Sequence, residues 1–324
     1  MKLTSSKVIF LSGIALFIIA SIWLTLNDQF ASLKPYLHKL EASWLSIILL
    51  HAVIYRFVNA CGWVFIMRTL RTSIPIRKGV QIWLVSETCR WLPGSIWSTF
   101  SRVHLSQKAK LPITSVSIGV SIEFMITILA WSMVACTGIL YSGSYHVITP
   151  YLKDLKSIAI VVCAGIFTCL AGLLFINTLI RHSEKISSQL LTLKKHLIDV
   201  KERGVSSLGL LGVLAFFALC CFYNGYIFWL ILESLDLSVS LSKAVMANSL
   251  GWIVGFLAIA APGGIGVREA TLTLVLLDTS SAQAIGLCAV LWRLTQITSE
   301  LVCLIPWLCQ KLFSLIQNKL NHAN

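Results

Sequence analysis

The chain has 324 residues, of which 57% are hydrophobic and only 12% are charged, and its mean hydropathy is +0.84. This composition lies outside the range of soluble globular proteins and predicts an integral membrane protein. We interpret the formal net charge of +13 as an orientation signal of a membrane protein, and not as a nucleic-acid-binding surface, so no nucleic acid is expected among the partners.

Seven apolar windows approach or exceed the length of about 20 residues that a helix needs to cross a bilayer. Because they cover most of the sequence, we expect an all-α, polytopic fold in a single integral membrane domain, residues 1–324. No small-residue cleavage site follows the first window, which is therefore predicted to be a retained helix and not a signal peptide. The windows are 8–26, 44–67, 114–141, 157–180, 205–232, 244–267 and 279–308.

The 26 Lys and Arg residues are unevenly distributed when these windows are threaded through a membrane with the N-terminus inside. Seventeen fall on the inner side, Arg102 among them, and five on the outer side, while Arg56, Arg90, Arg268 and Arg293 lie at membrane depth. The positive-inside rule therefore predicts that both termini are cytoplasmic. This threading requires segments 79–111 and 243–278 each to return to the side from which they entered.

Both of these segments are interrupted by a Pro-Gly break. Proline removes a backbone donor and glycine permits a chain reversal, so each segment is predicted to be a re-entrant helical hairpin in addition to about six full spans. Irregular backbone at membrane depth needs partners from protein or from a water-filled cavity, so the two hairpins should meet near a cavity. The breaks contain Pro93 and Gly94 in the first segment and Pro262, Gly263, Gly264 and Gly266 in the second.

Helix, hairpin and helix follow one another twice, at 44–141 and 205–308, with opposite predicted orientations. This is the inverted repeat of many transporters, whose binding site lies at the repeat interface near the bilayer midplane. The other parts of the predicted domain are a first helix and loop at 1–43, a helix and basic cytoplasmic loop at 142–204, and a cytoplasmic tail at 309–324.

Ionisable side chains at membrane depth are costly, and they usually face a partner or a transport pathway. Arg293 and Glu300 share a helix face by their spacing, as do Glu87 and Arg90. Arg268 and its neighbour Glu269 point in different directions, so each should have a partner on another helix. The full set of candidates is Glu87, Arg90, Arg102, Glu123, Arg268, Glu269, Arg293 and Glu300.

Two interpretations of this set remain open. The residues could form ion pairs that tie the hairpins to their neighbours. Alternatively, the arginines and the N-H groups freed by the glycines could converge on one cavity and bind an anion such as phosphate, with the glutamates carrying protons. The sequence contains no G-x-S-x-G, H-E-x-x-H, Walker A or Asp-rich metal motif. We therefore expect a non-enzymatic protein without metal or cofactor.

The stretch A-P-G-G-I-G-V-R-E at 261–269, followed in the next helix by Arg293, resembles the signature of the membrane domain of the lysylphosphatidylglycerol synthetase/flippase family. The earlier R-W-L-P-G at 90–94, with Arg102 and Glu123, is similar to the first-half motif of that family. By position, the resemblance assigns Arg102, Glu123, Arg268, Glu269 and Arg293 to a central site.

The resemblance implies a free-standing, flippase-like protein of the bacterial cytoplasmic (inner) membrane that translocates an anionic amphipathic lipid between leaflets. A phospholipid and a polyprenyl-phosphate carrier are both candidate ligands. The aminoacyl transfer of the family's namesake belongs to a separate soluble domain, which does not fit within this sequence, so lipid lysylation is not expected.

Two other functions stay open at this point. The protein could be a membrane-embedded transferase, or an accessory subunit partnered with enzymes of envelope lipid or glycan synthesis, that uses a buried glutamate as base. It could also be an ion-coupled carrier of a small solute. The expected substrate-binding residues are Arg90, Pro93, Gly94, Arg102, Glu123, Pro262, Gly263, Gly264, Gly266, Arg268, Glu269, Arg293 and Glu300.

Overall fold

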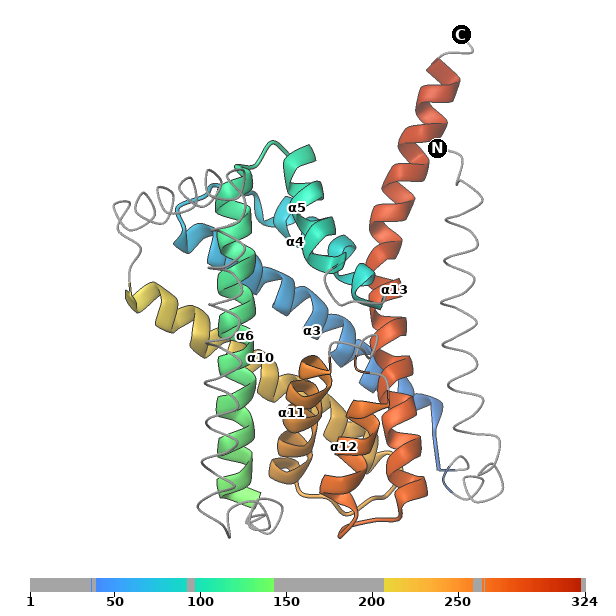
Figure 1. Cartoon of the computed structure of the whole chain (residues 1–324). Helices are drawn as coiled ribbons and strands as arrows, with labels where there is room; N and C mark the ends of the chain where they lie inside the picture. The colour runs from blue at the N-terminus through green and yellow to red at the C-terminus, as the bar shows by residue number, and fades with distance from the viewer. Residues whose placement is uncertain are drawn as a thin grey trace.

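The computed structural model describes residues 36, 39–91, 97–142, 207–258, 264 and 266–321, and every regular element among them is helical, which confirms the all-α prediction. The windows predicted at 8–26 and 157–180 and the loop at 181–204 lie outside the described residues. The helices are α3 (Ala42–Thr69), α4 (Ile76–Glu87), the 3-10 turn η1 (Thr88–Trp91), α5 (Trp97–Lys108), α6 (Ile113–Ser142), α10 (Ser207–Glu233), α11 (Leu241–Leu257), α12 (Val267–Leu276) and α13 (Ala282–Asn321) (Figure 1).

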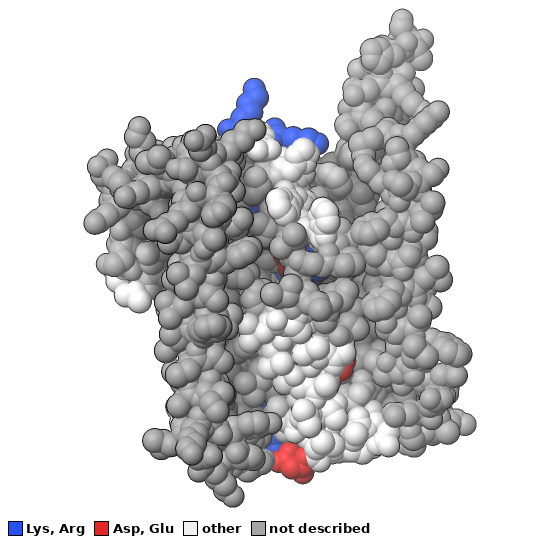
Figure 2. Space-filling model, viewed as in Figure 1, with Lys and Arg blue, Asp and Glu red and all other residues white. Residues whose placement is uncertain are grey.

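Four of these helices, α3, α6, α10 and α13, are long and apolar enough to cross a membrane. They coincide with four of the predicted windows. Much of their apolar surface faces outward, as at Met125, Leu219 and Leu140, which are 70%, 69% and 63% exposed. Figure 2 shows that the described surface between the blue side chains at one end and the red ones at the other is mostly white, and so mostly uncharged. Helices that are apolar on most faces are typical of a lipid environment.

The last helix is longer than the sequence analysis expected. Residues 309–321, which were predicted to form a tail, continue α13 without interruption, although Pro306 lies inside the helix. Figure 1 shows this end of α13 projecting beyond the other helices. The helix continues because this segment contains several Lys, Gln and Leu residues, which have high helix propensity.

The short helices form two broken pairs, α4 with α5 and α11 with α12. They lie toward opposite ends of the molecule, and α6 and α13 run between these ends in opposite directions (Figure 1). Helices α4 and α5 have 12 residues each and pack against one another. Helices α11 and α12 also pack against one another. The breaks themselves, with Pro93, Gly94, Pro262 and Gly263, lie outside the described residues.

The first long helix of each half ends in the same way. Arg71 (φ 53°) and Asp236 (φ 55°) both adopt the left-handed conformation just after α3 and α10. In each case the N-H of this residue and that of the next residue bond back to carbonyls of the last helical turn, as in a Schellman motif. Helices α4 and α11 then begin at Ile76 and Leu241. Both pairs of positions lie 165 residues apart.

The same 165-residue offset relates the buried faces of α3 and α10. Two of the four matched pairs are identical residues, and all eight side chains are almost completely buried, so the two halves share one helix register. The matched pairs are Trp63 with Phe228, Ile66 with Ile231, Met67 with Leu232 and Leu70 with Leu235.

Helix α11 occupies the space between α6 and α10. Gly138 on α6 and Gly225 on α10 allow this approach, because an added Cβ would lie 2.7 Å from Met246 Cβ at the first and 2.8 Å from Val245 Cα at the second. The close fit fixes α11, which carries Trp252 toward the centre of the molecule.

Candidate functional site

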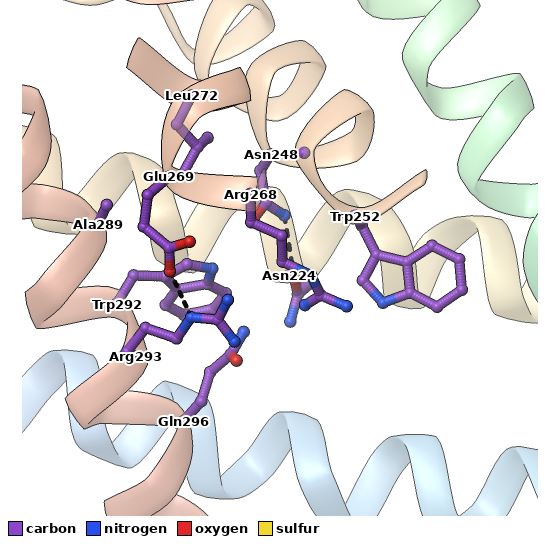
Figure 3. Close-up of a pocket in the computed structure, with 11 residues that line it drawn as sticks. Asn224, Asn248, Trp252, Arg268, Glu269, Leu272, Ala289, Trp292, Arg293 and Gln296 are labelled. Atoms are coloured by element: carbon purple, nitrogen blue, oxygen red, sulfur yellow. Dashed lines mark hydrogen bonds and ion pairs between the residues drawn. The ribbon is translucent and has the colours of Figure 1, made fainter. Parts of the chain in front are cut away.

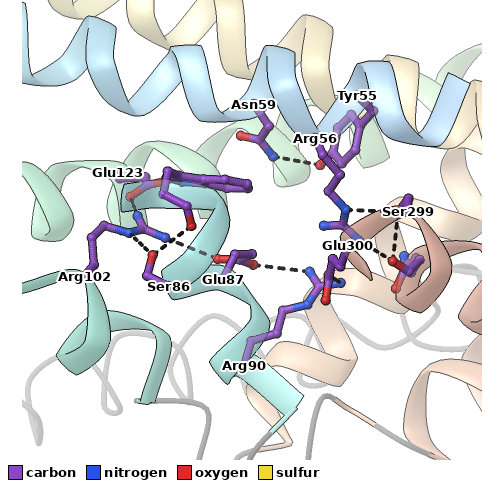
Figure 4. Close-up of polar contacts among 12 residues, drawn as sticks. Tyr55, Arg56, Asn59, Ser86, Glu87, Arg90, Arg102, Glu123, Ser299 and Glu300 are labelled. Atoms are coloured by element: carbon purple, nitrogen blue, oxygen red, sulfur yellow. Dashed lines mark hydrogen bonds and ion pairs between the residues drawn. The ribbon is translucent and has the colours of Figure 1, made fainter. Parts of the chain in front are cut away.

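A chain of ion pairs runs without interruption from α6 to α3 (Figure 4). Arginines and glutamates alternate along it, three of each, so that the chain carries no net charge. Its members come from α6, α5, α4, η1, α13 and α3, and it therefore connects both halves of the protein. In order they are Glu123, Arg102, Glu87, Arg90, Glu300 and Arg56.

Arg102 occupies one end of this chain. It pairs with Glu123, its Nη2 lies 3.2 Å from Glu87 Oε2, and its Nε donates to Ser86 Oγ at 3.0 Å. The other oxygen of Glu123 accepts a hydrogen bond of 2.7 Å from Trp83 Nε1. Arg102 was expected on the inner side of the membrane, whereas it is only 5% exposed in the structure, because Glu87 and Glu123 provide its partners inside the protein.

The other end of the chain depends on Glu300 of α13. Its Oε1 lies 2.6 Å from Arg90 Nη2 and 2.9 Å from Arg56 Nη2. Arg56 was expected at membrane depth but was not included in the expected site. Its position in the middle of an apolar window was the available signal, since a buried arginine requires a charged partner.

A second, separate ion pair joins the other broken helix pair to α13. Glu269 Oε1 on α12 lies 2.6 Å from Arg293 Nε, which supplies the partner that the sequence analysis expected for Glu269. The corresponding pair in the first half joins Arg102 on α5 to Glu123 on α6. The two halves thus use the same connection with the signs exchanged.

Arg268 differs from these arginines. No carboxylate among the described residues forms an ion pair with it, and its Nε is buried without a hydrogen-bond partner, in contrast to the expectation from sequence. Its guanidinium lies 5.9 Å from the centre of the Trp252 ring. The side chain passes close to Gly255 and Gly264, where an added Cβ would lie 2.7 Å and 2.9 Å from Arg268 Nε.

Gly264 and Gly266 adopt φ values of 70° and 82° ahead of α12. Left-handed backbone of this kind costs glycine little, so the glycine-rich sequence here permits the turn that directs Arg268 inward. Gly264 is buried against Gly255, whereas Gly266 is exposed and precedes the first turn of α12.

Two cavities adjoin these residues. The smaller, of about 20 Å³, is lined by Arg268, Glu269 and Arg293 together with polar residues of α10, α11 and α13 (Figure 3), and has room for about one water molecule. The larger, of about 150 Å³, is lined by Arg90, Arg102 and other members of the ion-pair chain. Trp252 lines both cavities.

The expected site residues that the structure describes thus fall into two groups. Arg90, Arg102, Glu123 and Glu300 belong to the ion-pair chain, while Arg268, Glu269 and Arg293 surround the smaller cavity. A buried amide pair also lines that cavity, in which Asn248 Nδ2 donates to Asn224 Oδ1 at 3.0 Å.

A comparison with protein families matches residues 10–302 to the family described as lysylphosphatidylglycerol synthase TM region. The chain belongs to this family. The match includes both broken helix pairs and all of the ion pairs above, and it confirms the resemblance drawn from the two sequence motifs. Together with the four long apolar helices, it identifies a multi-pass membrane protein. No curated protein matches the chain.

Proposed function

We propose that this protein binds an anionic amphipathic lipid, a phospholipid or a polyprenyl-phosphate carrier, and moves it between the leaflets of a bacterial cytoplasmic membrane. The observation that carries the proposal is the uncompensated charge of Arg268. Among the described arginines at the two cavities, Arg56, Arg90, Arg102 and Arg293 each contact a glutamate. A buried guanidinium without an anion is costly, and phosphate oxygens match its planar set of donors.

The path for the lipid would be framed by two re-entrant hairpins, α4 with α5 and α11 with α12, that enter from opposite membrane faces. The two arms of the first hairpin have 12 residues each and are about 18 Å long at 1.5 Å per residue, a little over half of the hydrocarbon thickness. The arms of the second have 17 and 10 residues. The shared 165-residue register and the opposed directions of α6 and α13 support an inverted repeat. Such repeats place their ligand near the midplane, where Arg268 would lie.

The ion-pair chain suits a pathway for a charged head group. Because it alternates in sign, it supplies polar contacts across the interior without an excess charge that would hold a ligand too tightly. The acyl chains would stay in the bilayer, beside the outward apolar faces of the long helices, while the head group crosses the polar interior.

The transferase alternative needs a carboxylate that can take up a proton. Both oxygens of Glu123 accept hydrogen bonds, from Trp83 and from Arg102, whereas Glu269 Oε2 is buried without a hydrogen-bond partner among the described residues. Glu269 is therefore the residue on which this alternative rests. It predicts a new product from a lipid acceptor and an activated donor, and loss of that product in Glu269→Gln.

Translocation can be tested in proteoliposomes that contain phosphatidylglycerol with a fluorophore attached to one acyl chain. A membrane-impermeant quencher reports the fraction of label in the outer leaflet over time.

We expect transport by the wild type and a reduction of at least about tenfold in Arg268→Gln, because one charge-assisted contact is lost. Arg77→Gln, the same change at an exposed position of α4, serves as the control and should transport normally. A wild-type rate equal to that of protein-free vesicles would refute the proposal.

A further inference from the structure

The charges that line the two cavities define what kind of head group they can accept. Three glutamates, Glu87, Glu123 and Glu269, line the cavities, and a fourth, Glu300, contacts two arginines that line the larger one. Each of the four is bound to at least one arginine. Five arginines face them, and Arg268 is the member left without a carboxylate among the described residues. A ligand with one negative charge would balance this set, whereas a ligand with a net positive charge would add to the excess.

The larger cavity has no excess charge once Glu300 is counted with Arg56 and Arg90, but it also has no carboxylate available to bind a cation. Arg56, Arg90 and Arg102 line it, against Glu87 and Glu123, and both carboxylates are already engaged. An ammonium group placed there would meet like charges and no uncommitted carboxylate, which is unfavourable in a buried, low-dielectric site.

The walls of this cavity are instead suited to an uncharged polar group. Trp131, Trp252 and Phe256 form a stack with ring centroids 5.1 Å apart at each step and interplanar angles of 13° and 1°, and all three line the cavity. Flat aromatic faces of this kind pack against the C-H faces of a polyol or sugar. The stack reaches Arg268, whose guanidinium lies over Trp252.

Hydrogen-bonding groups lie opposite this aromatic wall. Asn59 lines the cavity, and its Oδ1 is buried with no hydrogen-bond partner among the described residues, while its Nδ2 donates to the Tyr55 hydroxyl at 2.9 Å. Ser98, Thr99 and Thr127 line the cavity as well. A buried, unsatisfied acceptor is costly and is relieved by a ligand hydroxyl.

We propose that the head group is a singly charged phosphate diester that carries an uncharged polyol, either glycerol or a sugar, and that it is not an aminoacylated or otherwise cationic group. This inference rests on the proposed function. The polyol lies in the larger cavity against the Trp131, Trp252 and Phe256 stack, with a hydroxyl donating to Asn59 Oδ1. The phosphate contacts Arg268 beside Trp252, which lines both cavities, because the smaller cavity has room for only about one water molecule. Glu269 Oε2, whose charge Arg293 offsets, is placed to accept a second hydroxyl.

The test is a competition in nanodiscs of phosphatidylcholine that hold equal mole fractions of three lipids. Phosphatidylglycerol has one negative charge and a polyol, phosphatidylmethanol has the charge without the polyol, and lysylphosphatidylglycerol has a net positive charge. Native mass spectrometry measures which lipid the released protein retains. We expect retention of phosphatidylglycerol about tenfold over the lysylated lipid and about fivefold over phosphatidylmethanol, the effect of one hydrogen bond.

Asn59→Leu should abolish the preference over phosphatidylmethanol and keep the preference over the lysylated lipid. Ser121→Leu, a polar-to-apolar change on the exposed face of α6, should leave both ratios at their wild-type values. Equal retention of the lysylated lipid by the wild type would overturn the charge assignment, and equal retention of phosphatidylmethanol would overturn the polyol assignment. Neither result depends on the folding of a variant.

The competition also separates this inference from the proposed function. Selective retention without movement in the proteoliposomes would refute translocation and leave the head-group assignment intact. Equal movement of all three lipids would support translocation and refute the assignment. Displacement of the retained lipid by soluble glycerol phosphate at equal concentration would refute a lipid ligand, because the acyl chains would then contribute nothing to binding.

Discussion

Arg90 and Glu300 connect the two halves of the protein. Arg90 lies in the turn η1 that follows α4, and its Nη2 is 2.6 Å from Glu300 Oε1 on α13. The same oxygen is 2.9 Å from Arg56 Nη2 on α3. One carboxylate thus offsets two guanidinium groups, and the first broken helix pair is held against the last helix through it.

Glu300→Gln should therefore destabilise the protein strongly. The substitution keeps the shape of the side chain but leaves the charges of Arg56 and Arg90 under-compensated, and breaking a buried ion pair from one side costs about 3–5 kcal/mol. Unfolding in detergent measures this loss. Asp236→Asn is the control, because Asp236 is 72% exposed in its pair with Lys39 and such a pair contributes at most about 1 kcal/mol. Similar losses in the two variants would contradict the account.

Arg268→Met should have the opposite effect on stability. Methionine keeps an unbranched stem and removes a largely buried charge that has no carboxylate partner among the described residues, so we expect the free energy of unfolding in lipid-free detergent to rise by about 1–3 kcal/mol. Arg293→Met makes the same chemical change where Glu269 is the partner, and it should destabilise. A loss of stability in both variants would indicate that Arg268 has a structural partner after all.

Gly255→Ala should displace Arg268. A Cβ at this position would lie 2.7 Å from Arg268 Nε, and overpacking of this kind costs about 1–3 kcal/mol. The double variant Gly255→Ala with Arg268→Ala should recover most of the loss, since the obstructing atoms are gone. Gly286→Ala on α13, where nothing lies within 4 Å of the added Cβ, should be neutral or stabilising by up to about 1 kcal/mol. Thermal unfolding of the four proteins distinguishes these outcomes.

Exchange of Glu269 and Arg293 tests whether their pair acts as a simple connection between α12 and α13. Each single change, Glu269→Arg or Arg293→Glu, places like charges together and should destabilise. The double change restores opposite charges in the order already used by Arg102 and Glu123 in the first half. A double-mutant cycle should give a favourable coupling of about 1–3 kcal/mol, and an additive result would show that the residues act independently.

Much of the fold is predictable because apolar length and charge placement are local properties. The windows at 44–67 and 114–141 predicted α3 and α6 to within two residues, since a spanning helix is defined by its own sequence. The end of α13 was not predicted, because a polar segment after a span is compatible with either a tail or a continued helix.

The site was predictable as a set of residues but not as a set of contacts. Costly charges at membrane depth identified Arg90, Arg102 and Glu300, and helical spacing brought Glu87 together with Arg90. Spacing contains no information about which helices meet, so the role of Arg56 became evident only from its distance to Glu300. The same limit concealed the difference between Arg102, which has two carboxylate partners, and Arg268, which has none among the described residues.

The central claim is that Arg268 holds an anionic lipid. The most direct measurement is mass spectrometry of the lipid that remains bound to wild-type protein and to Arg268→Gln after purification in a mild detergent from the same membranes, with Arg77→Gln as the matched control. We expect wild type and Arg77→Gln to retain an anionic lipid and Arg268→Gln, although folded, to retain at least about tenfold less of it. Equal retention by wild type and Arg268→Gln would contradict the account.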